Sequence, residues 1–172
     1  MVYKQLVVLL IFAIILGMGA NLLSPNKIEF ISAYRDLSGS DGPIIPPDAV
    51  ENDPPFIDIN VAHFEHSTQR TIFIDAREPE EFNCGTIPGS INIPFDLLPD
   101  GDLKLYFDSC LGHIAYDQPI VTYCSGEECD LSLHLARNLA DNGYTNIMIF
   151  FGGSREWEKF GLPIERRTEC GE

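Results

Sequence analysis

Basic side chains are scarce in this sequence. Its 172 residues include 11 lysines and arginines against 26 aspartates and glutamates, which gives a formal net charge of −15 at pH 7. Such a charge repels the phosphates of nucleic acids and anionic lipid headgroups, so neither is expected as a partner. A chain of this length with 45% hydrophobic residues can bury one substantial core, which predicts a single globular domain.

Long apolar runs are also few, and the most pronounced one lies at the N-terminus. Residues 6–23 form a stretch of 18 residues without a charged side chain, near the lower limit for a helix that spans a bilayer. We predict a transmembrane anchor over residues 1–23. A cleaved signal peptide, with Lys4 as its basic region and cleavage before Ala20, is the alternative, and a buried core helix is the least favoured. Both membrane interpretations favour an exported domain, periplasmic or extracellular.

The next segment lacks the periodicity of a helix or a strand. Residues 24–55 contain the stretches SGSDGPIIPPD and ENDPP, which are rich in glycine, proline and acidic residues. Their proline content makes such a segment stiffer than a glycine-serine linker. We therefore predict a tether over residues 24–55, a domain over residues 56–167 and a short tail over residues 168–172. No internal repeat is found.

Beyond the predicted tether, short apolar runs alternate with helical patterns. Strands are predicted at TIFIDA, SINIP, PIVTYC and NIMIF, which are rich in β-branched residues. Helices are predicted at IDINVAHFEH with a cap from Asp58 or Asn60, at EPEEF, at residues 102–110, at DLSLHLARNLADNG and at GSREWEKFG. This alternation predicts an α/β domain with a central parallel sheet and helices on both of its faces.

The stretch VTYCSGEECD places a cysteine at a point where chemistry is expected. A strand that ends at Cys124 and a helix that begins near Asp130 put the intervening loop at the carboxyl edge of a parallel sheet, where α/β proteins build their sites. Backbone N–H groups and the positive end of the helix dipole would stabilise an anionic sulfur there. Gly126 is free to adopt a positive φ. The alternative is a buried structural cysteine beside an ordinary connection.

Three blocks between residues 57 and 165 resemble the rhodanese-like family. FIDAREPEEFNCGTIPGSINIP (Phe73 to Pro94) is similar to the family's aspartate and arginine after a strand, followed by E-F, a glycine and I-P-G. VTYCSGEECDLSLHLARNLADNGYTNI is similar to its active-site loop, and GGSREWEKFGLPIE (Gly152 to Glu165) to its terminal glycine and tryptophan block. The resemblance implies a rhodanese-like three-layer fold with a central parallel sheet flanked by helices, here preceded by an N-terminal transmembrane helix.

The resemblance also implies a sulfurtransferase whose catalytic residue is Cys124. This cysteine takes a sulfane sulfur from a donor, holds it as a persulfide and passes it to a thiol acceptor, either of which can be a protein. No cofactor and no metal are expected. The implied cradle around the persulfide consists of Ser125, Gly126, Glu127, Glu128 and Cys129.

The sequence departs from the family pattern at two places. The loop of thiosulfate-using members often carries basic side chains, whereas here Glu127, Glu128 and Asp130 carry carboxylates. These should raise a thiol pKa and repel thiosulfate, which favours a neutral or protein-borne donor. Thr86 occupies a position where the family commonly has a histidine, and we interpret it as a turn residue.

Cys129 is a second thiol on the same tight loop. It is a candidate resolving thiol, able to convert a persulfide or a sulfenic acid on Cys124 into an intraloop disulfide. The alternative is a small residue that packs against the start of the helix. Two other functions therefore stay open: a thiol-disulfide or redox-sensing module that uses Cys124 and Cys129, and a non-catalytic rhodanese-like binding domain.

The remaining candidate residues are interpreted as structural. Asp75 and Arg77 are expected to brace the loops, because an arginine fork fixes neighbouring carboxylates and carbonyls. Trp157 is expected in the core. His113 and His134 form no established metal-ligand spacing with the loop cysteines. A dual-specificity phosphatase is excluded because the loop contains no arginine.

Overall fold

The structure of the chain is a computed structural model that describes residue 3, residue 5 and residues 42–168. The described elements belong to one compact unit, residues 37–172. No helix of the described residues is long and apolar enough to cross a membrane. Apart from residues 3 and 5, the predicted anchor over residues 1–23 lies outside the described residues and stays a prediction.

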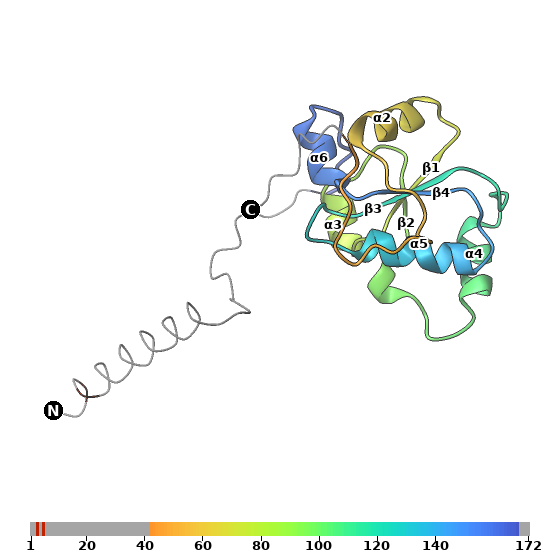
Figure 1. The fold of residues 1–172 in the computed structure, drawn as a ribbon, viewed down its shortest axis with the longest axis horizontal. Coiled ribbons are helices and arrows are strands. Elements are labelled where there is room, and N and C mark those ends of the chain that lie inside the picture. The colour runs from red at the N-terminus through yellow and green to blue at the C-terminus, as the bar shows by residue number, and fades with distance from the viewer. Residues whose placement is uncertain (1–2, 4, 6–41, 169–172) are drawn as a thin grey trace. The chain divides into compact units, whose positions relative to one another are not determined.

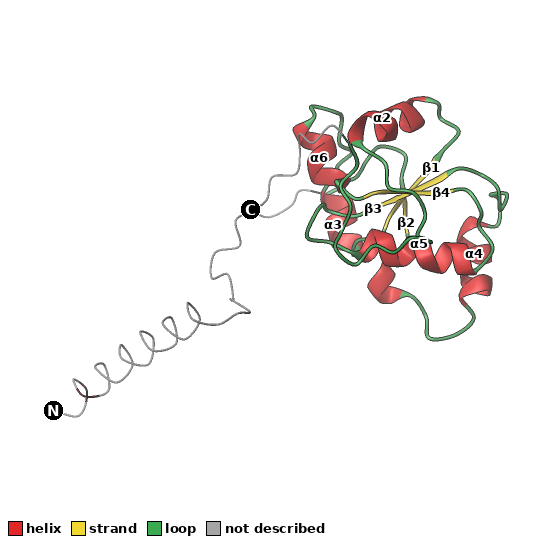
Figure 2. Cartoon of the chain, viewed as in Figure 1, coloured by secondary structure: helices red, strands yellow, loops and turns green. Residues whose placement is uncertain are grey.

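A four-stranded parallel sheet forms the centre of the domain (Figure 2). Its spatial order is β2-β1-β3-β4, and the register aligns Asp75 with Tyr123 and Tyr123 with Phe150. The prediction of a parallel α/β sheet is therefore confirmed. The strands are β1 (Ile72–Asp75), β2 (Ile91–Asn92), β3 (Ile120–Tyr123) and β4 (Ile147–Phe150).

Helices cover both faces of this sheet, as predicted. Figure 1 shows α2 and α6 on one side of the strands and α4 and α5 on the other. Their bounds agree with the sequence patterns to within one or two residues. The helices are α2 (Ile59–Ser67), α3 (Pro79–Cys84), α4 (Leu103–Leu111), α5 (Leu131–Asp141) and α6 (Gly153–Lys159), with the 3-10 helix η1 (Phe95–Leu97) after β2.

The strands explain why two separate clusters of apolar side chains form. Successive residues of a strand point to opposite faces, so Ile74 packs with helices α4 and α5 while Phe73 packs with α2 and α6. Every residue of β3 is buried, which is why its sequence, IVTY, does not alternate between core-facing apolar and exposed polar residues. Trp157, fully buried in the second cluster, is a core residue as predicted.

The helix starts follow local signals in the sequence. Of the two predicted caps of α2, Asp58 is the one used: its Oδ1 accepts hydrogen bonds from the N–H groups of Asn60 (2.8 Å) and Val61 (2.9 Å). Asp102 caps α4 in the same way, by accepting from Leu105 N–H at 3.1 Å. Pro79 occupies the first position of α3, where its missing N–H is not needed.

The last part of the predicted tether lies against the domain. Ile44 is only 6% exposed and belongs to the core cluster of α4 and α5. The carboxylate of Asp53 pairs with Arg137 of α5 at 2.7 Å, and Pro55 O accepts a hydrogen bond from Ile149 N–H of β4 at 2.9 Å. Glycine and proline exclude helix and strand from this segment, but they do not prevent an extended chain from attaching to a surface.

Candidate active site

The loop from Cys124 to Asp130 lies where the sequence placed it. Strand β3 ends at Tyr123, Cys124 follows with no exposed surface, and α5 begins at Leu131. The loop therefore stands at the carboxyl edge of the sheet. It connects the end of β3, one of the two central strands, to the start of α5.

The start of α6 fixes the backbone of this loop. Ser154 N–H donates to Cys124 O at 2.9 Å, and Arg155 N–H donates to Ser125 O at 3.1 Å. The approach requires Gly153, whose φ is 63°, because a Cβ there would lie 2.4 Å from Cys124 O. Gly126 has a φ of 145°, and a Cβ there would lie 3.1 Å from Gly152 O, a less severe approach. Sequence reasoning singled out Gly126 and missed Gly153, although the glycine pair that opens the third family block was a signal for it.

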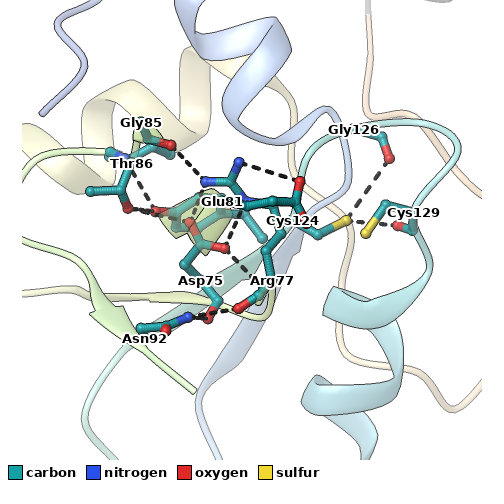
Figure 3. Close-up of polar contacts among 11 residues, drawn as sticks. Asp75, Arg77, Glu81, Gly85, Thr86, Asn92, Cys124, Gly126 and Cys129 are labelled. Carbon is teal, nitrogen blue, oxygen red and sulfur yellow. Dashed lines mark hydrogen bonds and ion pairs between the residues drawn. The ribbon is translucent and has the colours of Figure 1, made fainter. Parts of the chain in front are cut away.

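The Cys124 thiol is enclosed by groups of its own loop. Its Sγ lies 2.7 Å from Cys129 O and 3.9 Å from Gly126 O, and Ser132 Oγ–H donates to it at 3.6 Å. Figure 3 shows the sulfurs of Cys124 and Cys129 pointing toward one another inside the loop. Carbonyl oxygens accept hydrogen bonds, so these close contacts favour a neutral thiol at Cys124.

The two thiols shift each other's pKa in opposite directions. Burial, followed by the hydrogen bond and the charge of the neighbouring Cys129 thiol, raises the pKa of Cys124 well above its usual value. The hydrogen bond from the Cys124 thiol lowers the pKa of Cys129 to about 6, aided by the backbone N–H groups of Ser125 and Leu131 and opposed by burial. These directions favour the anionic form at Cys129 over that at Cys124.

This distribution of charge differs from the sequence analysis in two respects. The anionic sulfur was expected at Cys124, yet the amide groups of the loop support the sulfur of Cys129. A rise in the thiol pKa was attributed to the carboxylates of the loop, whereas burial and the neighbouring thiol are the main causes. Both differences arise because Cys124 lies below the surface while Cys129 is half-exposed.

Asp75 and Arg77 form a buried pair at the carboxyl end of β1. Arg77 Nε donates to Asp75 Oδ1 at 2.9 Å and Nη2 to Oδ2 at 2.6 Å, while Nη2 also donates to Gly85 O at 2.7 Å. Asn92 Nδ2 donates to the carbonyls of Asp75 (3.1 Å) and Arg77 (2.8 Å). The pair thus links the segments that follow β1 and α3, and Asn92 joins them to β2 (Figure 3).

Thr86 has a role that sequence reasoning missed. Its side chain is fully buried and contacts both Asp75 Oδ2 (3.3 Å) and the hydroxyl of Tyr123 (2.6 Å). Tyr123 in turn accepts a hydrogen bond from Ile87 N–H at 3.1 Å. Thr86 therefore links the Asp75 and Arg77 pair to the last residue of β3. The interpretation of Thr86 as a turn residue is wrong, because its backbone forms an antiparallel bridge with Glu165. No local pattern indicates either contact, because Tyr123 and Glu165 are far away in the sequence.

A pocket of about 340 Å³ opens beside the loop. It is bounded by the start of α6, by α3 and by Ser125, the residue after Cys124, and neither loop cysteine lines it. Arginines and glutamates both face it, so it carries no strong charge of one sign. The charged residues of its lining are Arg77, Glu80, Glu81, Arg155, Glu158 and Arg166.

The described cysteines differ in their bonding state. Cys84, at the end of α3, is disulfide-bonded. Cys110, Cys124 and Cys129 are free thiols, and Cys170 lies outside the described residues.

One surface group has a geometry that a cation would accept. The ligand atoms of Asp48, Asp130 and His134 lie within 4.8 Å of one another. Asp130 and His134 already contact each other at 3.3 Å on successive turns at the start of α5, and both aspartates are exposed. Exposed acidic groups of this kind are common without a metal, so the cluster alone does not make a site.

Comparisons with known proteins agree with this geometry. The profile of the rhodanese-like domain family matches residues 62–160. Over 98 residues the chain is 33% identical to an HTH-type transcriptional regulator of Mycobacterium tuberculosis, covering 57% of this chain and 39% of the regulator. It is 30% identical to a sulfurtransferase of Allochromatium vinosum, covering 56% of this chain and 80% of that protein. The crystal structure of a Bacillus halodurans protein matches with a TM-score of 0.56 and 21% identity, over 67% of this chain and 78% of that one, which supports the fold.

Proposed function

Because the chain belongs to the rhodanese-like domain family, we propose that it is a sulfurtransferase that carries sulfane sulfur as a persulfide on Cys124. The observation that carries this proposal is the Cys124 thiol at the centre of the loop, at the carboxyl edge of the sheet, with a second thiol beside it. A cysteine that forms a covalent intermediate divides one sulfur transfer into two easier displacements.

The neighbouring thiol supplies the base that Cys124 needs. The Cys124 thiol donates to Cys129 O at 2.7 Å, and the thiol of Cys129 beside it has a pKa lowered to about 6. When Cys124 attacks the sulfane sulfur of a donor, its proton passes to the neighbouring Cys129 thiolate. The donor's leaving group departs with the electron pair of the broken sulfur–sulfur bond, and Cys124 retains the transferred sulfur.

The first test is direct detection of the persulfide. The full chain is incubated with inorganic polysulfide, thiosulfate or a persulfide-bearing protein, and Cys124 is mapped by mass spectrometry after alkylation. We expect one additional sulfur on Cys124 with polysulfide or the protein donor. Absence of added sulfur with every donor, in both the wild type and Cys129→Ser, would refute the proposed activity.

We infer a donor other than thiosulfate from the charge of the loop. Glu128 and Asp130 are exposed and Glu127 is half-exposed, so an approaching dianion meets carboxylates first. Replacing both glutamates (Glu127→Lys with Glu128→Lys) should raise kcat/KM for thiosulfate about tenfold by removing this repulsion. Steady-state kinetics with thiosulfate measure the effect.

A matched control separates local from global charge. Asp117→Lys with Asp141→Lys changes the net charge equally, but these exposed residues precede β3 and end α5, at the opposite edge of the sheet. We expect little change in that variant. The loop carboxylates do not govern donor choice if kcat/KM for thiosulfate is equal in both double variants. The same follows if kcat/KM is lower in the loop variant than in the wild type.

The facing thiols also favour a second candidate function. A thiol-disulfide or redox-sensing module would use Cys124 and Cys129 without sulfur transfer. Hydrogen peroxide would then convert the pair to a disulfide while polysulfide adds no sulfur in either the wild type or Cys129→Ser. Sulfur found on Cys124 of the Cys129→Ser variant separates the sulfurtransferase from this module.

We further propose that residues 6–23 anchor the chain and that the domain lies on the exported side of the membrane. The disulfide-bonded Cys84 supports this location, since disulfides persist mainly in oxidising compartments. An alkaline phosphatase fusion after Ser40 should be active, with a mature N-terminus at Met1 in the membrane fraction. An inactive fusion would place the domain in the cytoplasm, and an N-terminus at Ala20 would indicate a cleaved signal peptide.

A further inference from the structure

Cys129 is positioned to react with the sulfur of Cys124. The backbone turns back at this point, with Cys129 N–H donating to Gly126 O at 2.8 Å and Cys129 O lying 2.7 Å from Cys124 Sγ. Both sulfurs point into the same small loop and toward one another (Figure 3). A reaction between them needs no second encounter from solution, and such proximity greatly raises the effective concentration of a nucleophile.

The two sulfurs of a persulfide on Cys124 lead to different products. Attack on the terminal sulfur transfers it to the attacking thiol, whereas attack on Cys124 Sγ expels the terminal sulfur as sulfide. Cys124 Sγ has no exposed surface, so a thiol from solution meets the terminal sulfur instead. Cys129 lies inside the loop and faces Sγ itself.

We propose that Cys129 discharges the Cys124 persulfide within the loop, releasing the transferred sulfur as sulfide and leaving a Cys124–Cys129 disulfide that a dithiol reductant reopens. This inference rests on the proposed persulfide on Cys124. The product of the site is then sulfide, and its second substrate is a dithiol.

The step balances without any further reactant. The Cys129 sulfur forms a bond to Cys124 Sγ, and the bond between Sγ and the terminal sulfur breaks. The two cysteines are together oxidised by two electrons, and the sulfane sulfur is reduced to sulfide by the same two electrons. The proton that Cys129 received during loading leaves with the sulfide.

The surroundings of Cys129 favour this attack. Backbone N–H groups of Ser125 and Leu131 and the hydroxyl of Ser125 support its sulfur as an anion, and these groups remain after Cys124 has been loaded. Sulfide is a good leaving group because a leaving sulfur of low pKa departs readily. The internal reaction therefore has both a stabilised nucleophile and a favourable leaving group.

The exposure of the two cysteines indicates how the disulfide is reopened. Cys129 is half-exposed and Cys124 is buried, so a reductant attacks the sulfur of Cys129. A dithiol completes the reduction because its second thiol displaces the mixed disulfide internally, which a monothiol cannot do. Its docking surface is neutral or basic, since Glu128 and Asp130 are exposed beside Cys129.

The test follows the added sulfur in three versions of the full chain: wild type, Cys129→Ser and Cys110→Ser. Cys110 is a free cysteine of α4 outside the loop, which makes its variant a matched control. Each is loaded with inorganic tetrasulfide and freed from excess reagent by gel filtration. Intact mass, peptide mapping and released sulfide are then followed with time.

We expect Cys129→Ser to hold the added sulfur on Cys124 at least about tenfold longer than the other two chains. Wild type and Cys110→Ser should each release one sulfide per chain and form the Cys124–Cys129 disulfide. Dithiothreitol should reopen it at least about tenfold faster than 2-mercaptoethanol at equal thiol concentration.

Equal persulfide lifetimes in wild type and Cys129→Ser would overturn the inference, as would sulfide release without the loop disulfide. These results would leave the proposed function standing, because Cys124 would still carry sulfur. Failure of all three chains to take up sulfur would instead refute the proposed function, and the inference with it.

Discussion

Replacing Cys124 with serine is expected to lower sulfur transfer to an acceptor by at least about a thousandfold, to the background rate. The serine hydroxyl cannot form a persulfide, so the covalent intermediate is lost. The fold should remain, because the hydroxyl fills nearly the same buried volume and can donate to Cys129 O as the thiol does. Transfer to a thiol acceptor, followed by mass spectrometry, measures the effect.

The same replacement at Cys110 provides the control for a lost thiol. Cys110 lies on α4, outside the loop, so Cys110→Ser should keep full activity. The fluorescence of Trp157, the single tryptophan, reports whether each variant is folded. Transfer that survives in a folded Cys124→Ser chain would show that another residue carries the sulfur.

Replacing Asp75 with alanine should lower the free energy of unfolding by about 3–5 kcal/mol. Asp75 has no exposed surface, and its carboxylate holds the guanidinium of Arg77, which is 6% exposed, through two hydrogen bonds. Removal of the carboxylate leaves the charge of Arg77 buried without its partner. Urea unfolding followed by Trp157 fluorescence measures the loss, which should also disturb the loop through Tyr123 and Thr86.

Two further variants test the cause of this loss. Asp108→Ala removes a carboxylate that pairs with Lys104 and accepts from Tyr116 at an exposed site, and it should lower the free energy of unfolding far less than Asp75→Ala. Asp75→Ala combined with Arg77→Met removes both buried charges and should be more stable than Asp75→Ala alone. If Asp75→Ala lowers the free energy of unfolding no more than Asp108→Ala does, the buried pair has no bracing role.

Local signals in the sequence were sufficient for the order of elements and for the location of the loop. The apolar run that ends at Cys124, the helical pattern after Asp130 and the cap at Asp58 depend on residues close together in the chain. Parallel pairing follows, because helices that alternate with strands carry the chain back across the sheet. The resemblance of three blocks then identified the family before any geometry was known.

Contacts between distant segments required the structure. The attachment of residues 44–55 depends on Arg137 of α5, and the role of Thr86 depends on Tyr123 of β3. The need for glycine at position 153 comes from the approach of α6 to the loop carbonyl of Cys124. None of these partners is a neighbour in the sequence, so no local pattern indicates them.

The sequence by itself determined that two thiols share one loop at the carboxyl edge of a parallel sheet. It could not determine which of them is the anion, because exposure and hydrogen bonding set a thiol pKa and both are properties of the folded loop. The tertiary structure buries Cys124, leaves Cys129 half-exposed and directs the amide groups of Ser125 and Leu131 to the sulfur of Cys129. Burial disfavours the charged form and amide donors favour it, so the folded loop favours the anion at Cys129 over that at Cys124.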